Sequence, residues 1–336
     1  MSTDRISITG CPLLTAADIE TFAKKVDLNE TEVVSLNKLL KEIDNLFHKQ
    51  PQILETMPGG VTNKNFHAIL EDNTQLAIRL GGAGTSNYID RPGERHNASE
   101  MASIGIAPKV FYSCTENGAQ ITEYIDAPTM HPADFQTRDE VLIKAGEVLF
   151  RIHNSGKEFI SSFDPLAAID GYLAILEQEN YGKRYEGWER IRENLLKLKE
   201  IYRKNPPKQV PCHNDTLAEN FMLEGDTMRM IDWEYSGMND GYFDIACVCV
   251  ENPLDDKCEE VFHRAYCGGE PSELQKARLL INKFLVTSHW STWSLVQIAY
   301  GKDPDFFWEY GRVRAVQALS FLDNPNFPHY LDLISG

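Results

Sequence analysis

Residues 212–220 of the chain read Cys-His-Asn-Asp-Thr-Leu-Ala-Glu-Asn, and twelve residues later comes Asp232, within Met-Ile-Asp-Trp-Glu-Tyr at 230–235. Between them, residues 221–223 and 228–231 are short β-prone runs, and Glu-Gly-Asp at 224–226 is a turn signal. The pattern predicts a loop followed by a β-hairpin. An acid at the exit of this hairpin would share one cleft with Asp215 and Asn220 of the loop.

The spacing of these three polar residues is typical of phosphoryl transfer. In a kinase loop of the form H-x-D-x-x-x-x-N, the Asp orients the attacking hydroxyl, the Asn holds magnesium, and a later Asp holds the metals that bridge the phosphates. These roles are predicted for Asp215, Asn220 and Asp232, so that Asn220 and Asp232 are the metal ligands. The alternative is that Asp215 and Asn220 are turn formers and that Asp232 caps a strand.

Composition limits the class of protein. A chain of 336 residues is long for one core, so two domains are expected. Because the sequence has neither a long apolar run nor a signal-peptide pattern, we expect a cytoplasmic protein with no membrane span. Its seven cysteines include no CxxC pair and are predicted to be free thiols. The net charge of −17 disfavours nucleic acid and anionic membranes as partners and favours a small cation.

Hydrophobic periodicity predicts the order of the elements. Residues 30–48 have helical spacing, and β-prone runs follow at 53–57, 66–70 and 75–80. A helix at 94–104 and strands at 109–114 and 119–125 complete a small lobe, and a helix at 140–153 begins a mostly helical remainder. The predicted fold is α+β and two-lobed, like that of protein kinases. An N-terminal antiparallel-sheet lobe with one helix spans 1–124, with leading helices within 1–50, and the larger helical lobe spans 125–336.

Two features of the small lobe fit a bound nucleotide. A glycine-bearing turn joins the first two strands, where a kinase has its phosphate loop, and its candidate contacts are Gly59, Gly60, Thr62 and Asn63. Pro-Gly-Gly is also an ordinary hairpin turn. Arg79 ends Leu-Ala-Ile-Arg, in the place of the third-strand kinase lysine, and keeps the positive charge. Glu94 is its expected ion-pair partner, although a glutamate there could instead stabilise its own helix N-terminus.

The stretch after Asp232 bears on the acceptor. It contains neither a Phe-Gly pair nor Ala-Pro-Glu, and so lacks the segment with which protein kinases present a peptide. The acceptor is therefore expected to be a small molecule. Backbone groups of Glu123 and Ile125, at the lobe junction, are expected to contact adenine.

Taken together, the motifs resemble the choline/ethanolamine kinase family, within the aminoglycoside-phosphotransferase-like group. The matching blocks span roughly residues 55–320 and are 59–63, Arg79, Glu94 with 105–109, 213–215, 231–235 and 243–245. The resemblance implies an enzyme that uses ATP and Mg²⁺ to phosphorylate the hydroxyl of a small cationic amino alcohol.

The same resemblance suggests an acceptor site further along the chain. The family has an acid near the substrate ammonium, here Glu251, and paired tryptophans followed by a tyrosine, here Trp290, Trp293 and Tyr310. Tyr235 would complete the wall. Aromatic faces suit a quaternary ammonium, which donates no strong hydrogen bond, and two tryptophans three apart share a helix face. Tryptophans at this spacing can also be core residues.

One departure from the family leaves the substrate open. Residues 252–256 read Asn-Pro-Leu-Asp-Asp where eukaryotic members have aromatic residues, so the cage is expected to lack one wall. Choline is the predicted acceptor, with ethanolamine or another amino alcohol as the alternative. An aminoglycoside or sugar kinase, or a non-catalytic nucleotide or amine sensor, would use the same blocks differently. The sequence leaves the oligomeric state open.

Overall fold

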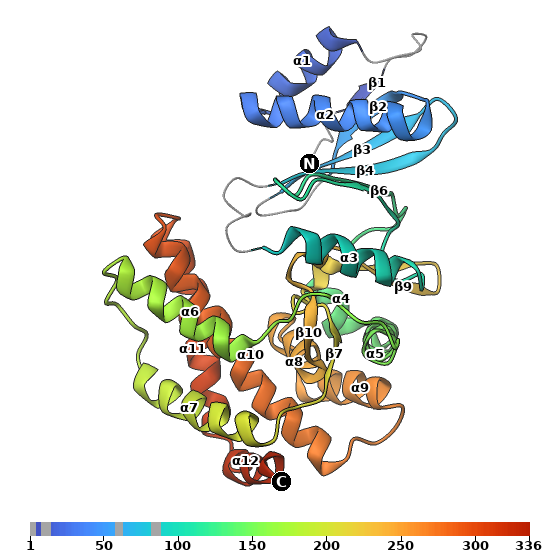
Figure 1. Ribbon diagram of the computed structural model, residues 1–336. Coiled ribbons are helices and arrows are strands. Elements are labelled where there is room, and N and C mark those ends of the chain that lie inside the picture. The colour runs from blue at the N-terminus through green and yellow to red at the C-terminus, as the bar shows by residue number, and fades with distance from the viewer. Residues whose placement is uncertain (1–4, 8–14, 58–62, 82–88) are drawn as a thin grey trace. The chain divides into compact units, whose positions relative to one another are not determined.

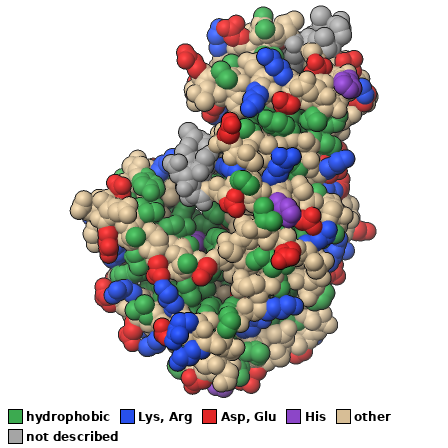
Figure 2. All heavy atoms as spheres, in the orientation of Figure 1, with side chains coloured by type: hydrophobic (Ala, Val, Ile, Leu, Met, Phe, Trp, Pro, Cys, Tyr) green, Lys and Arg blue, Asp and Glu red, His purple; other side chains and the backbone are tan. Residues whose placement is uncertain are grey.

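The computed structural model describes residues 5–7, 15–57, 63–81 and 89–336 of the chain (Figure 1). Contacts divide it into two units: Met1–Pro128 with Met222–Tyr235, and Thr129–Phe221 with Ser236–Gly336. None of the described helices combines the length and apolar character of a transmembrane segment. Six described cysteines are free, as predicted, and Cys11 lies outside the described residues. Figure 2 shows acidic and basic side chains interspersed over the face in view.

The first unit contains an antiparallel six-stranded sheet in the order β1-β2-β3-β4-β6-β5. Its strands are β1 (Arg5–Ser7), β2 (Pro51–Thr56), β3 (Lys64–Leu70), β4 (Gln75–Leu80), β5 (Val110–Ser113) and β6 (Gln120–Glu123). The five predicted strands are confirmed. The short β1, which pairs with β2, was not expected from the sequence.

Three helices accompany this sheet: α1 (Ala16–Lys25), α2 (Glu30–Phe47) and α3 (Arg91–Ala102). Phe22 of α1 and Leu36 and Ile43 of α2 pack against the sheet in one buried cluster. The helix predicted at 94–104 is present but begins earlier, at Arg91. The Asp90 side chain caps it by accepting a hydrogen bond from the backbone N–H of Gly93 at 3.1 Å.

The predicted hairpin is also present, as β8 (Phe221–Glu224) and β9 (Thr227–Met230). From Met222 to Tyr235 its contacts belong to the first unit. The backbone N–H of Met230 donates to the carbonyl of Ile106 at 3.0 Å, and Nη2 of Arg229 lies 3.0 Å from Oε2 of Glu123. The proposed lobes, 1–124 and 125–336, stay a prediction.

The second unit is mostly helical, as predicted. Its helices are α4 (Pro132–Thr137), α5 (Asp139–His153), α6 (Pro165–Gln178), α7 (Trp188–Lys204), α8 (Gly241–Glu251), α9 (Asp256–Cys267), α10 (Glu273–Ala299), α11 (Pro304–Leu322) and α12 (Phe327–Ser335). The long helix α10 packs against α6, α8, α11 and α12. Two antiparallel strands, β7 (Gln209–Cys212) and β10 (Gly237–Asp240), lie beside this bundle.

A glycine allows α10 and α11 to approach each other closely. A Cβ atom on Gly311 would lie 1.9 Å from Oγ of Ser294 and 2.1 Å from Oη of Tyr185. The Ser294 and Tyr185 hydroxyls are themselves hydrogen-bonded at 2.9 Å. A side chain at position 311 would therefore displace Ser294 and Tyr185 and break the hydrogen bond between them, or push α11 away from α10.

Two buried histidines of the second unit should make the protein sensitive to acid. Burial lowers the pKa of His263, and separately that of His289, from 6.5 to about 4. An unfolded chain would bind protons at these sites from pH 6.5 downward while the folded chain would not. The free energy of unfolding should then fall as pH drops from 6.5 to 4, by up to about 3 kcal/mol for each histidine.

Urea unfolding across this pH range would measure the effect. His263→Asn should flatten the decline, whereas His329→Asn, at an exposed position, should leave it unchanged. A His263 variant with the wild-type slope would contradict the assignment.

Candidate active site

A buried carboxylate fixes the loop that follows β7. Asp244, in the first turn of α8, is fully buried. It accepts hydrogen bonds from the backbone N–H of His213 at 2.8 Å and of Asn214 at 2.6 Å, and its carbonyl accepts one from the Thr216 hydroxyl at 2.8 Å. Asn214 has the left-handed φ of 67° that the turn requires. The loop before and after Asp215 is thus tied to α8.

Asp244 also contacts a side chain from another helix. Nε2 of His153, on α5, lies 3.1 Å from Oδ2 of Asp244, and Nδ1 of His153 lies 2.9 Å from the Tyr266 hydroxyl on α9. Sequence reasoning gave no role to Asp244 or His153. The available signal was one acid within the otherwise apolar stretch 242–250, where burial demands a partner.

The structure brings Asp215 and Asn220 together. Asn220 lies in a 3₁₀ turn, Ala218–Asn220, and is 7% exposed. Its Nδ2 donates to the backbone carbonyl of Asp215 at 2.8 Å and lies 3.4 Å from the Asp215 carboxylate. The predicted base and one predicted metal ligand therefore share a rigid loop in the second unit.

Asp232 lies in the first unit, at the half-exposed end of a network of mostly buried ion pairs. Nη1 of Arg79 is 3.2 Å from Oδ1 of Asp232, while Nη2 of Arg79 contacts Glu94. The predicted pair of Arg79 with Glu94 is therefore present. Arg91 joins the same network, with Nη1 at 2.7 Å from Glu94 and 3.3 Å from Glu234. That Asp215, Asn220 and Asp232 share one cavity stays a prediction.

The network offers oxygen ligands for a hard cation. Carboxylate oxygens of Glu94, Asp232 and Glu234 all lie within 4.8 Å of one another. Burial, and then the charge of Asp232, raises the pKa of Glu234 to about 7. Asp232 is the most exposed of the three, and its carboxylate is the kind of oxygen ligand that Mg²⁺ prefers.

The remaining predicted nucleotide contacts are only partly described. Gly59, Gly60 and Thr62 lie outside the described residues. Asn63, just before β3, is 7% exposed, and Ile125 is 4% exposed. The Glu123 carboxylate accepts a hydrogen bond from the backbone N–H of Lys109 at 3.1 Å.

The predicted aromatic residues of the second unit converge. The ring centres of Trp290 and Trp293, on α10, are 5.5 Å apart, and Tyr310, on α11, lies 6.0 Å from Trp293. Sequence reasoning missed Phe307, whose ring is 5.7 Å from Trp293 and adds aromatic surface. Tyr235 belongs to the first unit, and its place in the wall of the cage stays a prediction.

Glu251 lies beside the same cluster, paired with an arginine. Its Oε1 accepts a hydrogen bond from Nε of Arg314 at 2.9 Å, and its Oε2 contacts Nη2. The Arg314 guanidinium carbon lies 3.4 Å from the ring centre of Tyr310. The predicted contact of Glu251 with a substrate ammonium stays a prediction.

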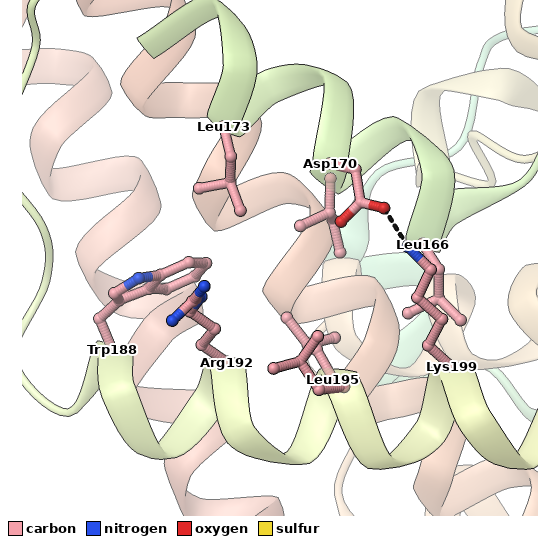
Figure 3. Close-up of a pocket in the computed structure, with 9 residues that line it drawn as sticks. Leu166, Asp170, Leu173, Trp188, Arg192, Leu195 and Lys199 are labelled. Atoms are coloured by element: carbon pink, nitrogen blue, oxygen red, sulfur yellow. Dashed lines mark hydrogen bonds and ion pairs between the residues drawn. The ribbon is translucent and has the colours of Figure 1, made fainter. Parts of the chain in front are cut away.

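A separate pocket of about 90 Å³ opens between α6 and α7 (Figure 3). Leu173, Trp188 and Leu195 line it, and the ion pair of Asp170 with Lys199 lies at its edge. No predicted site residue is among its lining residues.

If Asp244 fixes the loop, Asp244→Ala should loosen it. Two buried N–H groups would lose their acceptor, at about 1–3 kcal/mol each. We expect faster amide hydrogen exchange at His213 and Asn214 and a lower urea midpoint. Asp255→Ala is the matched control, because Asp255 also accepts a backbone N–H, that of Cys258 at 2.8 Å. Unchanged exchange at 213 and 214 would refute the tether.

Comparison with known proteins places these features in a family. A choline/ethanolamine kinase family protein from Mesorhizobium loti matches with TM-score 0.78 and 30% identity, over 90% of this chain and 99% of that one. Choline kinase LicA from Streptococcus pneumoniae matches with TM-score 0.70 and 28% identity, over 86% and 99%. Ethanolamine kinase 2 of Rattus norvegicus is 24% identical over 89% of this chain and 83% of its own length.

The family model agrees with these matches. It is described as choline/ethanolamine kinase and matches residues 54–318, which include the loop, the hairpin and the aromatic cluster. The fold is protein-kinase-like, as predicted. The chain is a small-molecule kinase that belongs to the choline/ethanolamine kinase family.

Proposed function

We propose that the enzyme transfers the γ-phosphoryl group of ATP to the hydroxyl of choline. The observation that carries this proposal is the convergence of Trp290, Trp293 and Tyr310 in the unit that holds Asp215. Burial raises the pKa of Tyr310 well above its usual value, and the charges of Glu251 and Asp215 add to this. The charge of the proposed base, Asp215, therefore acts on an aromatic residue of the proposed cage.

The proposed chemistry is positioning and charge neutralisation. Asp215 orients the acceptor hydroxyl and takes its proton as the bond from the acceptor oxygen to the γ-phosphorus forms and the bond from that phosphorus to the bridging oxygen breaks, which releases ADP. Asn220 and Asp232 would hold Mg²⁺, which would neutralise charge on the phosphate oxygens. Arg79, kept in place by Glu94, adds a positive charge there.

The nucleotide contacts are proposed on the same family pattern. Gly59, Gly60, Thr62 and Asn63 would cradle the phosphates. The backbone at Glu123 and Ile125 would contact adenine. The cytoplasmic location and the absence of nucleic-acid and membrane partners remain predictions.

Choline fits the aromatic cluster better than the other acceptors considered. Each aromatic face within reach of a cation contributes about 0.5–2 kcal/mol, without a hydrogen bond. Ethanolamine is the second candidate, because a relative carries that name. An aminoglycoside would require free acidic groups, whereas Glu251 is already paired with Arg314.

Removal of the proposed base should abolish turnover. In a coupled ADP-release assay with choline, Asp215→Ala should lower kcat by about 10²–10⁴-fold, while ATP binding stays measurable. Asp226→Ala, at an exposed position of the hairpin turn, is the control. Equal activity of Asp215→Ala and wild type would remove the base assignment.

Removal of an aromatic side chain from the proposed cage should raise the KM for choline but not the KM for ATP. Trp293→Ala should raise the KM for choline by about tenfold, the loss of one cation–π contact, and leave the KM for ATP nearly unchanged. Trp290→Ala should act in the same direction. Trp188 is a buried tryptophan of α7, and Trp188→Ala should lower stability without raising the KM for choline selectively. If both KM values rise alike, the α10 tryptophans are core residues.

A further inference from the structure

Arg314 connects the acid of the acceptor region to one of its aromatic rings. One edge of its guanidinium binds both carboxylate oxygens of Glu251, from α8. Its guanidinium carbon lies 3.4 Å from the centre of the Tyr310 ring, and its Nη1 donates to the Tyr310 carbonyl at 3.1 Å. The side chains are 14% exposed for Arg314 and 4% for Glu251. The arrangement is therefore rigid and largely shielded from water.

This geometry changes what Glu251 can do for a cation. A carboxylate with both oxygens on a guanidinium is already neutralised, and a second cation gains little from it. Without Glu251, however, Arg314 would be an uncompensated positive charge against Tyr310. It would then repel any ammonium held by the same ring.

We propose that Arg314 is a positioning residue that sets acceptor specificity, because it neutralises Glu251 and orients Tyr310. The acceptor's cation is then recognised by aromatic faces, and a methylated ammonium is preferred to a primary one. This inference rests on the proposed function.

The preference follows from hydration. A primary ammonium has three N–H donors and loses strong hydrogen bonds to water unless oxygen acceptors replace them. Glu251 cannot supply such an acceptor while Arg314 holds it. A quaternary ammonium has no donor to satisfy and is well stabilised by Trp290, Trp293 and Tyr310.

The wild-type enzyme tests the preference without any substitution. We would measure kcat/KM for ethanolamine, its N-methyl and N,N-dimethyl derivatives, and choline. The value should rise with each methyl group, to about tenfold or more in total. Equal kcat/KM values, or a preference for ethanolamine, would overturn the role of Arg314. The enzyme would still be a kinase for amino alcohols. Phosphorylation of none of the four would overturn the proposed function itself.

A double-variant cycle tests the mechanism. Glu251→Gln should raise the KM for choline about tenfold or more, because it leaves the Arg314 charge unpaired, and should change kcat less. Arg314→Met in the same chain should restore most of that loss. If Glu251 instead attracted the ammonium directly, the double variant would remain as poor as Glu251→Gln.

Single Arg314 variants complete the test. Arg314→Met should free Glu251 and shift the kcat/KM ratio toward ethanolamine, and Arg314→Lys should give an intermediate ratio. Arg312→Met and Glu309→Gln are matched controls, from an exposed ion pair on the same helix. Thermal unfolding of each variant checks folding. An unchanged ratio in folded Arg314 variants would overturn the proposal.

Discussion

The loop that follows β7, which holds the proposed base, depends on one buried charge. Asp244 has no exposed surface, so its carboxylate must be satisfied within the protein. It is satisfied by two consecutive backbone N–H groups and by His153, and these contacts fix the main chain at His213 and Asn214. The same burial that makes the charge costly makes the loop conformation specific, because an altered loop would leave donors and acceptor unpaired. The positions of Asp215 and Asn220 depend on these hydrogen bonds between the loop and Asp244.

The two units differ in the groups that surround their buried positive charges. In the first, Arg79 and Arg91 are balanced by Glu94, Asp232 and Glu234, and each partner is needed because a buried ion left alone is strongly destabilising. Such a network suits a bound phosphate, which can take the place of a carboxylate beside an arginine. It also suits a bound metal ion, which can take the place of an arginine beside a carboxylate. In the aromatic cluster of the second unit, the charge of Arg314 is paired with that of Glu251. That environment suits a weakly hydrated cation.

Local patterns allowed much of the fold to be predicted, and long-range contacts explain the remainder. The strands and the hairpin have alternating or turn-bounded sequences, so their positions were predicted correctly. The three residues of β1 are too few for a periodic pattern. The start of α3 depended on the Asp90 cap, which was overlooked. Arg314 and Glu251 are 63 positions apart, and no spacing rule links them. Pairing across such a distance follows only from how α8 and α11 pack.

The absence of a side chain at Gly311 has a consequence for the aromatic cluster. Tyr310 is its neighbour on α11, and Trp293 is the neighbour of Ser294, the residue that Gly311 faces on α10. The gap between the two rings is therefore governed by how closely two backbones can approach. A substitution at position 311 could therefore change the spacing of Trp293 and Tyr310 without replacing either ring.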